Sequence, residues 1–82
     1  MEYSEGDLVL VESFAGVDVK VRLLRRFVPR KNEWGASGWD AVLVYKSDVL
    51  KLIKKGVPYK KDTKPKVWVF DWEIIKKIKP NR

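Results

Sequence analysis

The 82-residue chain contains no cysteine and no histidine. Without cysteine it can form no disulfide, no zinc ribbon and no thiol nucleophile, and without histidine it lacks the imidazole base of a Ser-His-Asp triad. Its acidic residues show no paired spacing, and the glycine-containing residues 35–38 lack the Gly-Lys-Ser/Thr ending of a phosphate-binding loop. We therefore expect a binding module rather than an enzyme, with no cofactor and no metal.

Long apolar runs are also missing. No stretch approaches 18 apolar residues, which predicts no membrane span and no membrane partner. The first residues are acidic and lack the apolar segment of a signal peptide, so we expect a cytoplasmic protein. Glutamine is absent, asparagine occurs only twice and lysine is abundant, a composition typical of thermophile proteins. At this length, with 45% hydrophobic residues, we expect a single folded domain over residues 1–82.

Charge is distributed unevenly along the chain. The 18 Lys and Arg residues outnumber the 11 Asp and Glu residues, which gives a net charge of +7. Residues 1–19 hold five acidic and no basic side chains (−5), so residues 20–82 carry +12. One basic cluster spans residues 20–31, and a second, with eight lysines and two aspartates, spans residues 46–66.

The first half of the chain has the pattern of β-strands. Residues 7–12 are apolar on both faces, which favours a central strand. A short connection around Gly16 predicts a hairpin to residues 17–28, where apolar and charged residues alternate. The alternation is disturbed at Leu23 and Leu24, which predicts a β-bulge and a bend.

The second half mixes strands with a short helix. After the loop of residues 29–38, residues 39–45 and 66–70 alternate as strands. Residues 47–55 have helical periodicity, with Ser47 as the expected N-cap, Asp48 in the first turn and Gly56 after the last. Residues 71–79 fit either a helix capped by Asp71 or one helical turn over 71–75 followed by a short strand.

These elements predict a mainly β protein, an antiparallel sheet of about five strands curled into a small barrel with one short helix. The opening Gly-Asp-Leu-Val-Leu-Val and the closing Trp-Val-Phe-Asp-Trp-Glu-Ile-Ile resemble the SH3-like small β-barrels: Tudor, chromo and small archaeal chromatin proteins. The resemblance implies a last long strand, a single helical turn and a final short strand. Residues 46–66 depart from a minimal barrel of this type, and the alternative is an open α+β sheet with a packed helix.

The basic cluster of residues 20–31 is the first candidate site. Arginine binds phosphate oxygens with two parallel hydrogen bonds and also stacks on bases. The alternative is a solvated face that pairs with the acidic N-terminal strand, for example Arg22 with Glu12. We interpret the lysines of residues 54–66 as a solvated face, with a weak steering role for phosphates as the alternative.

Tryptophan is the second signal, because four of the 82 residues are Trp. We expect Trp39 and Trp72 in the core. Trp68 lies between two valines and should point to the surface if the valines are buried, with Lys66 on the same face. Trp34 lies in the polar loop. An exposed Trp on a basic surface can stack on unpaired bases, whereas the alternative is that these rings cover a thin core.

The sequence thus predicts a nucleic-acid-binding module of low sequence specificity, a monomer or weak dimer, with DNA and RNA both open. The alternative is a protein-interaction adaptor that uses the same Arg and Trp surface for an acidic partner. A third interpretation is that the basic charge reflects thermal adaptation alone. The predicted binding residues are Lys20, Arg22, Arg25, Arg26, Arg30, Lys31, Trp34, Lys66 and Trp68.

Overall fold

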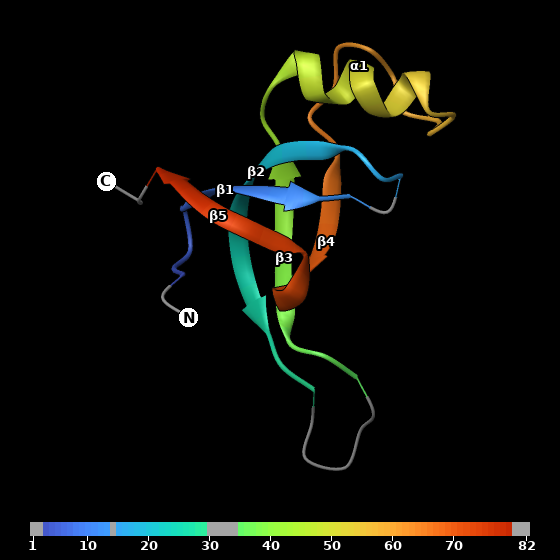
Figure 1. The fold of residues 1–82 in the computed structure, drawn as a ribbon. Coiled ribbons are helices and arrows are strands. Elements are labelled where there is room, and N and C mark those ends of the chain that lie inside the picture. Colours follow the sequence, from blue (N-terminus) through green and yellow to red (C-terminus); the bar gives the residue numbers. More distant parts are fainter. Residues whose placement is uncertain (1–2, 14, 30–34, 80–82) are drawn as a thin grey trace.

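The computed structural model describes residues 3–13, 15–29 and 35–79. These residues form one antiparallel five-stranded sheet of order β4-β3-β2-β1-β5 with a single α-helix at one end (Figure 1). The elements are β1 (Leu8–Glu12), β2 (Asp18–Phe27), β3 (Gly38–Leu43), α1 (Lys46–Lys54), β4 (Lys66–Phe70), the 3-10 helix η1 (Asp71–Glu73) and β5 (Ile74–Lys79). No helix among the described residues is long and apolar enough to cross a membrane.

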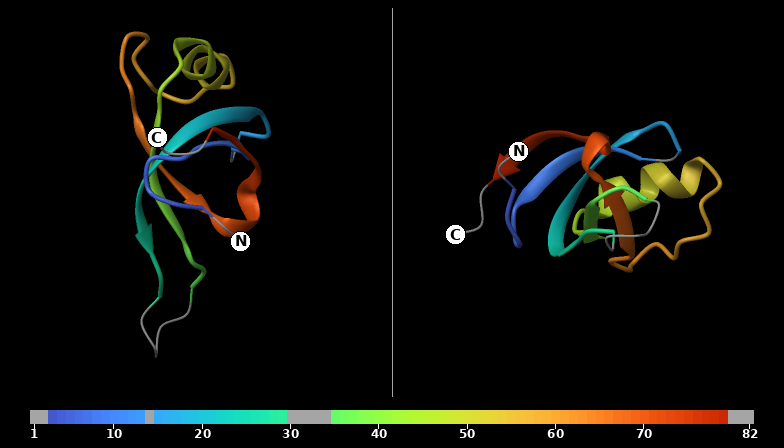
Figure 2. Two further views of the ribbon diagram at one scale, coloured as in Figure 1. Left: turned by 90° about the vertical axis from the view of Figure 1, so that its left-hand side faces the viewer. Right: turned by 90° about the horizontal axis from the view of Figure 1, so that it is seen from below.

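The sheet is strongly curved but open (Figure 2). The mainly β class, the five antiparallel strands and the single short helix are as predicted. Strands β4 and β5 form the two edges and do not pair with each other in the part of the chain described. The architecture therefore fits the open sheet that was the alternative to a closed barrel.

The β1–β2 hairpin has the expected form. Gly16 adopts a φ of 77°, and its N–H donates to the Ser13 carbonyl at 2.9 Å, which closes the turn. Strand β1 then lies between β2 and β5. Leu8, Val9 and Val11 of this central strand are buried, whereas Leu10 is partly exposed.

The predicted bulge is present in β2. The pairing with β3 shifts between Leu23 and Arg25, so Leu24 is the extra residue and has no partner on β3. A bulge bends its strand and changes the phase of the side chains that follow. Beyond it, Arg25 pairs with Asp40 and Arg26 pairs with the buried Trp39.

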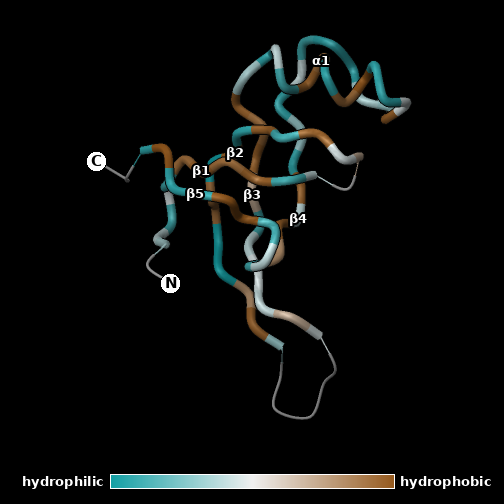
Figure 3. The backbone as a smooth tube through the Cα atoms, viewed as in Figure 1, coloured by the Kyte–Doolittle hydropathy of each residue, from teal (hydrophilic) through white to brown (hydrophobic). Residues whose placement is uncertain are grey.

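Helix α1 begins one residue earlier than predicted. Its N-cap is Tyr45, which has an extended backbone and no side-chain capping bond, so the assignment of Ser47 as N-cap is wrong. Instead the buried Asp48 carboxylate accepts the Lys20 N–H at 3.1 Å, which ties the first turn to β2. Along the helix, pairs of apolar residues are separated by polar residues, the spacing of an amphipathic helix (Figure 3). Gly56 follows the last turn with a φ of 95°, as expected.

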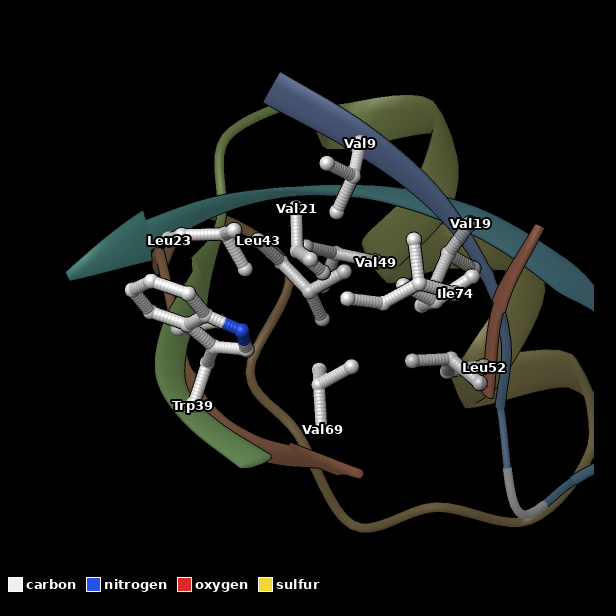
Figure 4. Close-up of a cluster of buried hydrophobic side chains, with 12 residues drawn as sticks. Val9, Val19, Val21, Leu23, Trp39, Leu43, Val49, Leu52, Val69 and Ile74 are labelled. Atoms are coloured by element: carbon white, nitrogen blue, oxygen red, sulfur yellow. The ribbon is translucent and has the colours of Figure 1, made fainter. Parts of the chain in front are cut away.

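The core lies on the concave side of the sheet, where side chains from all five strands and α1 point toward one another (Figure 4). Trp39 belongs to it as predicted, with 5% of its surface exposed. The prediction that Trp72 is also buried is wrong, because 70% of its surface is exposed. The cause is η1: the turn directs Trp72 outward, and Ile74, the first residue of β5, takes the inward position. Of the two C-terminal alternatives, a helical turn followed by a strand is confirmed.

Candidate functional site

Strand register brings chemically distinct side chains together on the outer face of β2, β3 and β4. Arg25, Asp40 and Trp68 lie side by side on successive strands. We call the surface formed by the outward residues of this region the outer face; it comprises Arg25, Phe27, Asp40, Lys66, Trp68 and Phe70. The core residues of the same strands, among them Trp39 and Val69, alternate with these positions. The outer face is thus a direct product of strand alternation and of the bulge in β2.

An open groove of about 730 Å³ runs over this face. Trp68 lines it with 75% of its surface exposed, which confirms the predicted surface position. Lys66 lies on the same side of β4, also as predicted. We call this the Trp68 groove; its lining residues are Leu24, Arg25, Asp40, Tyr59, Lys66, Val67 and Trp68.

Four aromatic rings form a continuous row from the groove to the end of β4. Ring centroids are 6.3 Å apart for Trp68 and Phe27, and 6.3 Å apart for Phe27 and Phe70. The Phe70 and Trp72 rings stack at 4.7 Å with 14° between their planes. Gly38 leaves room for the Phe27 ring in this row, because a Cβ there would lie 2.8 Å from Cζ of Phe27.

The two cations that line the Trp68 groove, Arg25 and Lys66, are only weakly neutralised by carboxylates. Nε of Arg25 lies 3.6 Å from Oδ2 of Asp40, and the Arg25 side chain is 76% exposed. Such an exposed pair contributes little and leaves the guanidinium available to another anion. Lys66 forms no ion pair within the described part of the chain. The loop before β4 adds three further exposed lysines without ion pairs to described residues, Lys60, Lys61 and Lys64.

Arg26 points to the other side of β2 and has a different role. It forms two hydrogen bonds to the Asp71 carboxylate, at 2.5 and 3.0 Å, and its guanidinium carbon lies 5.1 Å from the Trp39 ring. The hydrogen bonds that Arg26 donates to the Asp71 carboxylate raise the pKa of Arg26. This contact ties the bent end of β2 to η1, away from the Trp68 groove.

The remaining members of the basic cluster are also separated from the groove. Arg22 donates from Nη1 to the Gly6 carbonyl at 2.7 Å rather than pairing with Glu12, whose partner on β2 is Asp18. Nζ of Lys20 lies 5.3 Å from the Tyr45 ring. Of the predicted binding residues, the structure therefore brings together Arg25, Lys66 and Trp68. The predicted residues Arg30, Lys31 and Trp34 lie outside the described residues.

Sequence reasoning did not identify Tyr59 or the aromatic row. Phe70 could have been found, because it shares the parity of Lys66 and Trp68 on one strand. Its contact with Phe27 depends on the β2–β3–β4 register, and Tyr59 reaches the groove from a loop with no periodicity. Both required the tertiary structure.

No family model, no curated protein and no solved structure matches the chain. Among residues 3–13, 15–29 and 35–79, no group of three or more acidic side chains is placed to hold a metal ion. The chemistry of the outer face is an exposed aromatic surface, two accessible cations and one carboxylate. This combination suits reversible binding of a ligand that is both aromatic and anionic.

Proposed function

We propose that the protein is a nucleic-acid-binding module of low sequence specificity. The observation that carries the proposal is the exposed Trp68 ring, which lines one open groove together with Arg25 and Lys66. Aromatic rings stack on bases of any sequence, and arginine and lysine contact phosphate oxygens without reading the sequence. A nucleotide supplies both partners at once.

The charge of the chain supports the same function. Residues 20–82 carry +12, and the loop lysines next to the groove extend its positive charge. Such a field attracts polyanions and accelerates their encounter with the protein.

Low sequence specificity is expected because the only α-helix of the described residues packs against the sheet. Val49 and Leu52 of α1 are buried in the core, so the helix packs on the sheet and presents mainly lysines to solvent. A helix that reads the major groove instead presents base-contacting side chains from an exposed face. The contacts expected here are therefore to phosphates and to the faces of bases.

The test is a fluorescence anisotropy titration of labelled oligonucleotides of about 12 nucleotides, single-stranded and duplex, at about 50 and 200 mM salt. We compare the wild type with the double variant R25A/K66A. The matched control is K54A/K55A, which removes the same charge from exposed positions at the end of α1. Near-UV circular dichroism verifies that each variant is folded.

We expect wild-type affinity to fall about tenfold or more over this salt range. If Arg25 and Lys66 each contact one phosphate of a single strand, R25A/K66A reduces the slope of log K against log salt by about 1.4, because each contact contributes about 0.7. The control variant should change the slope by less than half of that. Absence of binding to the oligonucleotides at the lower salt by the folded protein contradicts the proposal. Weak salt dependence of binding contradicts the phosphate contacts and favours the alternative of a Trp-centred contact with a protein partner.

A further inference from the structure

We infer that Trp68 stacks on an unpaired base, which makes single-stranded nucleic acid the ligand of the Trp68 groove. The inference rests on the proposed function and adds the strand state of the ligand. It follows from the exposure of Trp68, from the placement of charges around it, and from the width of the outer face.

The Trp68 ring offers an accessible aromatic face. Three-quarters of the residue is exposed, and it lies on β4, an edge strand of the sheet. Its aromatic neighbour Phe27 is tilted by 55° with centroids 6.3 Å apart, so the two rings do not cover each other face to face. A base in a duplex already has both faces covered by its neighbours, whereas an unpaired base can place one face on the ring.

The cations flank the ring in two directions. Lys66 lies two residues before Trp68 on the same side of β4, a separation of about 7 Å along a strand. Arg25 lies across the sheet, on the far side of Asp40. A nucleotide stacked on Trp68 therefore has a cation on two sides, where the backbone of a single strand carries its phosphates.

Trp72 provides an internal comparison. It is 70% exposed and belongs to the same aromatic row, but Phe70 stacks on it at 4.7 Å. Among the described residues, those lining the hollow beside Trp72 include Glu12 and Glu73 and no Lys or Arg. Carboxylates repel phosphates, so an equally exposed ring in this place is unsuited to a nucleotide. The inference therefore distinguishes two tryptophans of similar exposure by their charged neighbours.

The width of the outer face argues against its insertion into the major groove of a duplex. The major groove is about 12 Å wide and admits a two-stranded ribbon. In a three-stranded sheet the backbones of the first and third strands are about 10 Å apart, and the side chains add further width. Trp68 lies within such a three-stranded surface, formed by β2, β3 and β4.

The experiment compares three ligands of equal length by anisotropy at about 50 mM salt: oligo-dT, oligo-rU and a duplex, each of about 12 nucleotides or base pairs. The proteins are the wild type, W68A, W68F and W72A. We expect the wild type to bind single strands at least about tenfold more tightly than the duplex. We expect W68A to weaken single-strand binding by about 5- to 150-fold, the loss that corresponds to one stacked base.

The substitutions separate stacking from charge. W68F keeps an aromatic face and should recover most of the affinity, whereas W72A should change it by about twofold or less. Duplex binding should be almost unaffected by W68A. Preferential binding of either oligo-dT or oligo-rU over the duplex supports the inference, and the difference in affinity between the two assigns the preferred sugar.

Failure of the inference is distinguishable from failure of the proposed function. Equal binding of duplex and single strands, or equal losses for W68A and W72A, overturns the inference and leaves phosphate binding in place. Absence of binding to all three ligands by the folded wild type overturns both.

Discussion

Replacement of Gly38 by alanine should separate β4 from β3. A Cβ at this position would lie 2.3 Å from the carbonyl oxygen of Val69 and 3.1 Å from Cα of Phe70. Because real Cβ atoms essentially never approach closer than 3.0 Å, the β4 backbone must retreat by about 0.7 Å. Backbone shifts of this kind cost about 1–3 kcal/mol. For a domain of this size, about 2 kcal/mol corresponds to a decrease in Tm of about 10 °C.

The assay is thermal and urea denaturation followed by tryptophan fluorescence and far-UV circular dichroism. S37A is the matched control: Ser37 precedes Gly38, and its main-chain carbonyl, which accepts the Asp71 N–H at 3.1 Å, is retained. It should change stability by less than about 0.5 kcal/mol. The double variant F27A/G38A should not recover the loss, because the closest contact is with the backbone and not with the Phe27 ring. Wild-type stability of G38A, or full recovery in the double variant, would refute this reasoning.

Three further predictions concern two charged pairs. A double-mutant cycle over R26A and D71A should give a coupling of about 1 kcal/mol, at the upper end for exposed pairs because the contact has two hydrogen bonds. Because the pKa of Arg26 is raised in the folded protein, the stabilisation that Arg26 provides is complete below the ordinary arginine pKa and is lost only as the pH rises above that value. The loss of urea stability caused by R26A should therefore be equal at about pH 6 and pH 9. D40N should tighten single-strand binding by up to about fivefold, because it removes the carboxylate 3.6 Å from Arg25 in the groove. Anisotropy titration of D62N, which neutralises an exposed Asp paired with Lys46 at 3.2 Å, is the control and should show a smaller gain.

Local patterns in the sequence were sufficient for most of the secondary structure. The alternation of residues 17–28 predicted β2 and its bulge, and residues 66–70 match β4 residue for residue. These patterns are reliable because successive side chains of a strand point to opposite faces of the sheet, and the apolar ones point to the core. The N-cap of α1 and the exposure of Trp72 were predicted wrongly. Asp48 of α1 accepts a hydrogen bond from Lys20, and Asp71 of η1 binds Ser37 and Arg26, so both elements are held by contacts between distant segments.

The candidate site was only partly predictable for the same reason. Parity along β4 was enough to place Lys66 and Trp68 on one face, and the structure shows that this face is exposed. Neighbouring charges in the chain suggested one basic patch, but the bulge directs Arg25 to the outer face and Arg26 to Asp71 on the opposite side. A cluster of charges in sequence is divided when consecutive strand residues point in opposite directions.

By itself the sequence determined the basic charge, the mainly β character, the bend in β2 and the shared face of Lys66 and Trp68, since each depends on composition or on residues close in the chain. The tertiary structure alone decided that the sheet stays open and that Arg25, Tyr59, Lys66 and Trp68 share one groove. It also decided that Trp68 shares its groove with two cations and one carboxylate, whereas the charged residues described around the hollow beside Trp72 are both glutamates. The physical reason is that strand register and loop packing bring together residues far apart in sequence, and no local pattern records those distances.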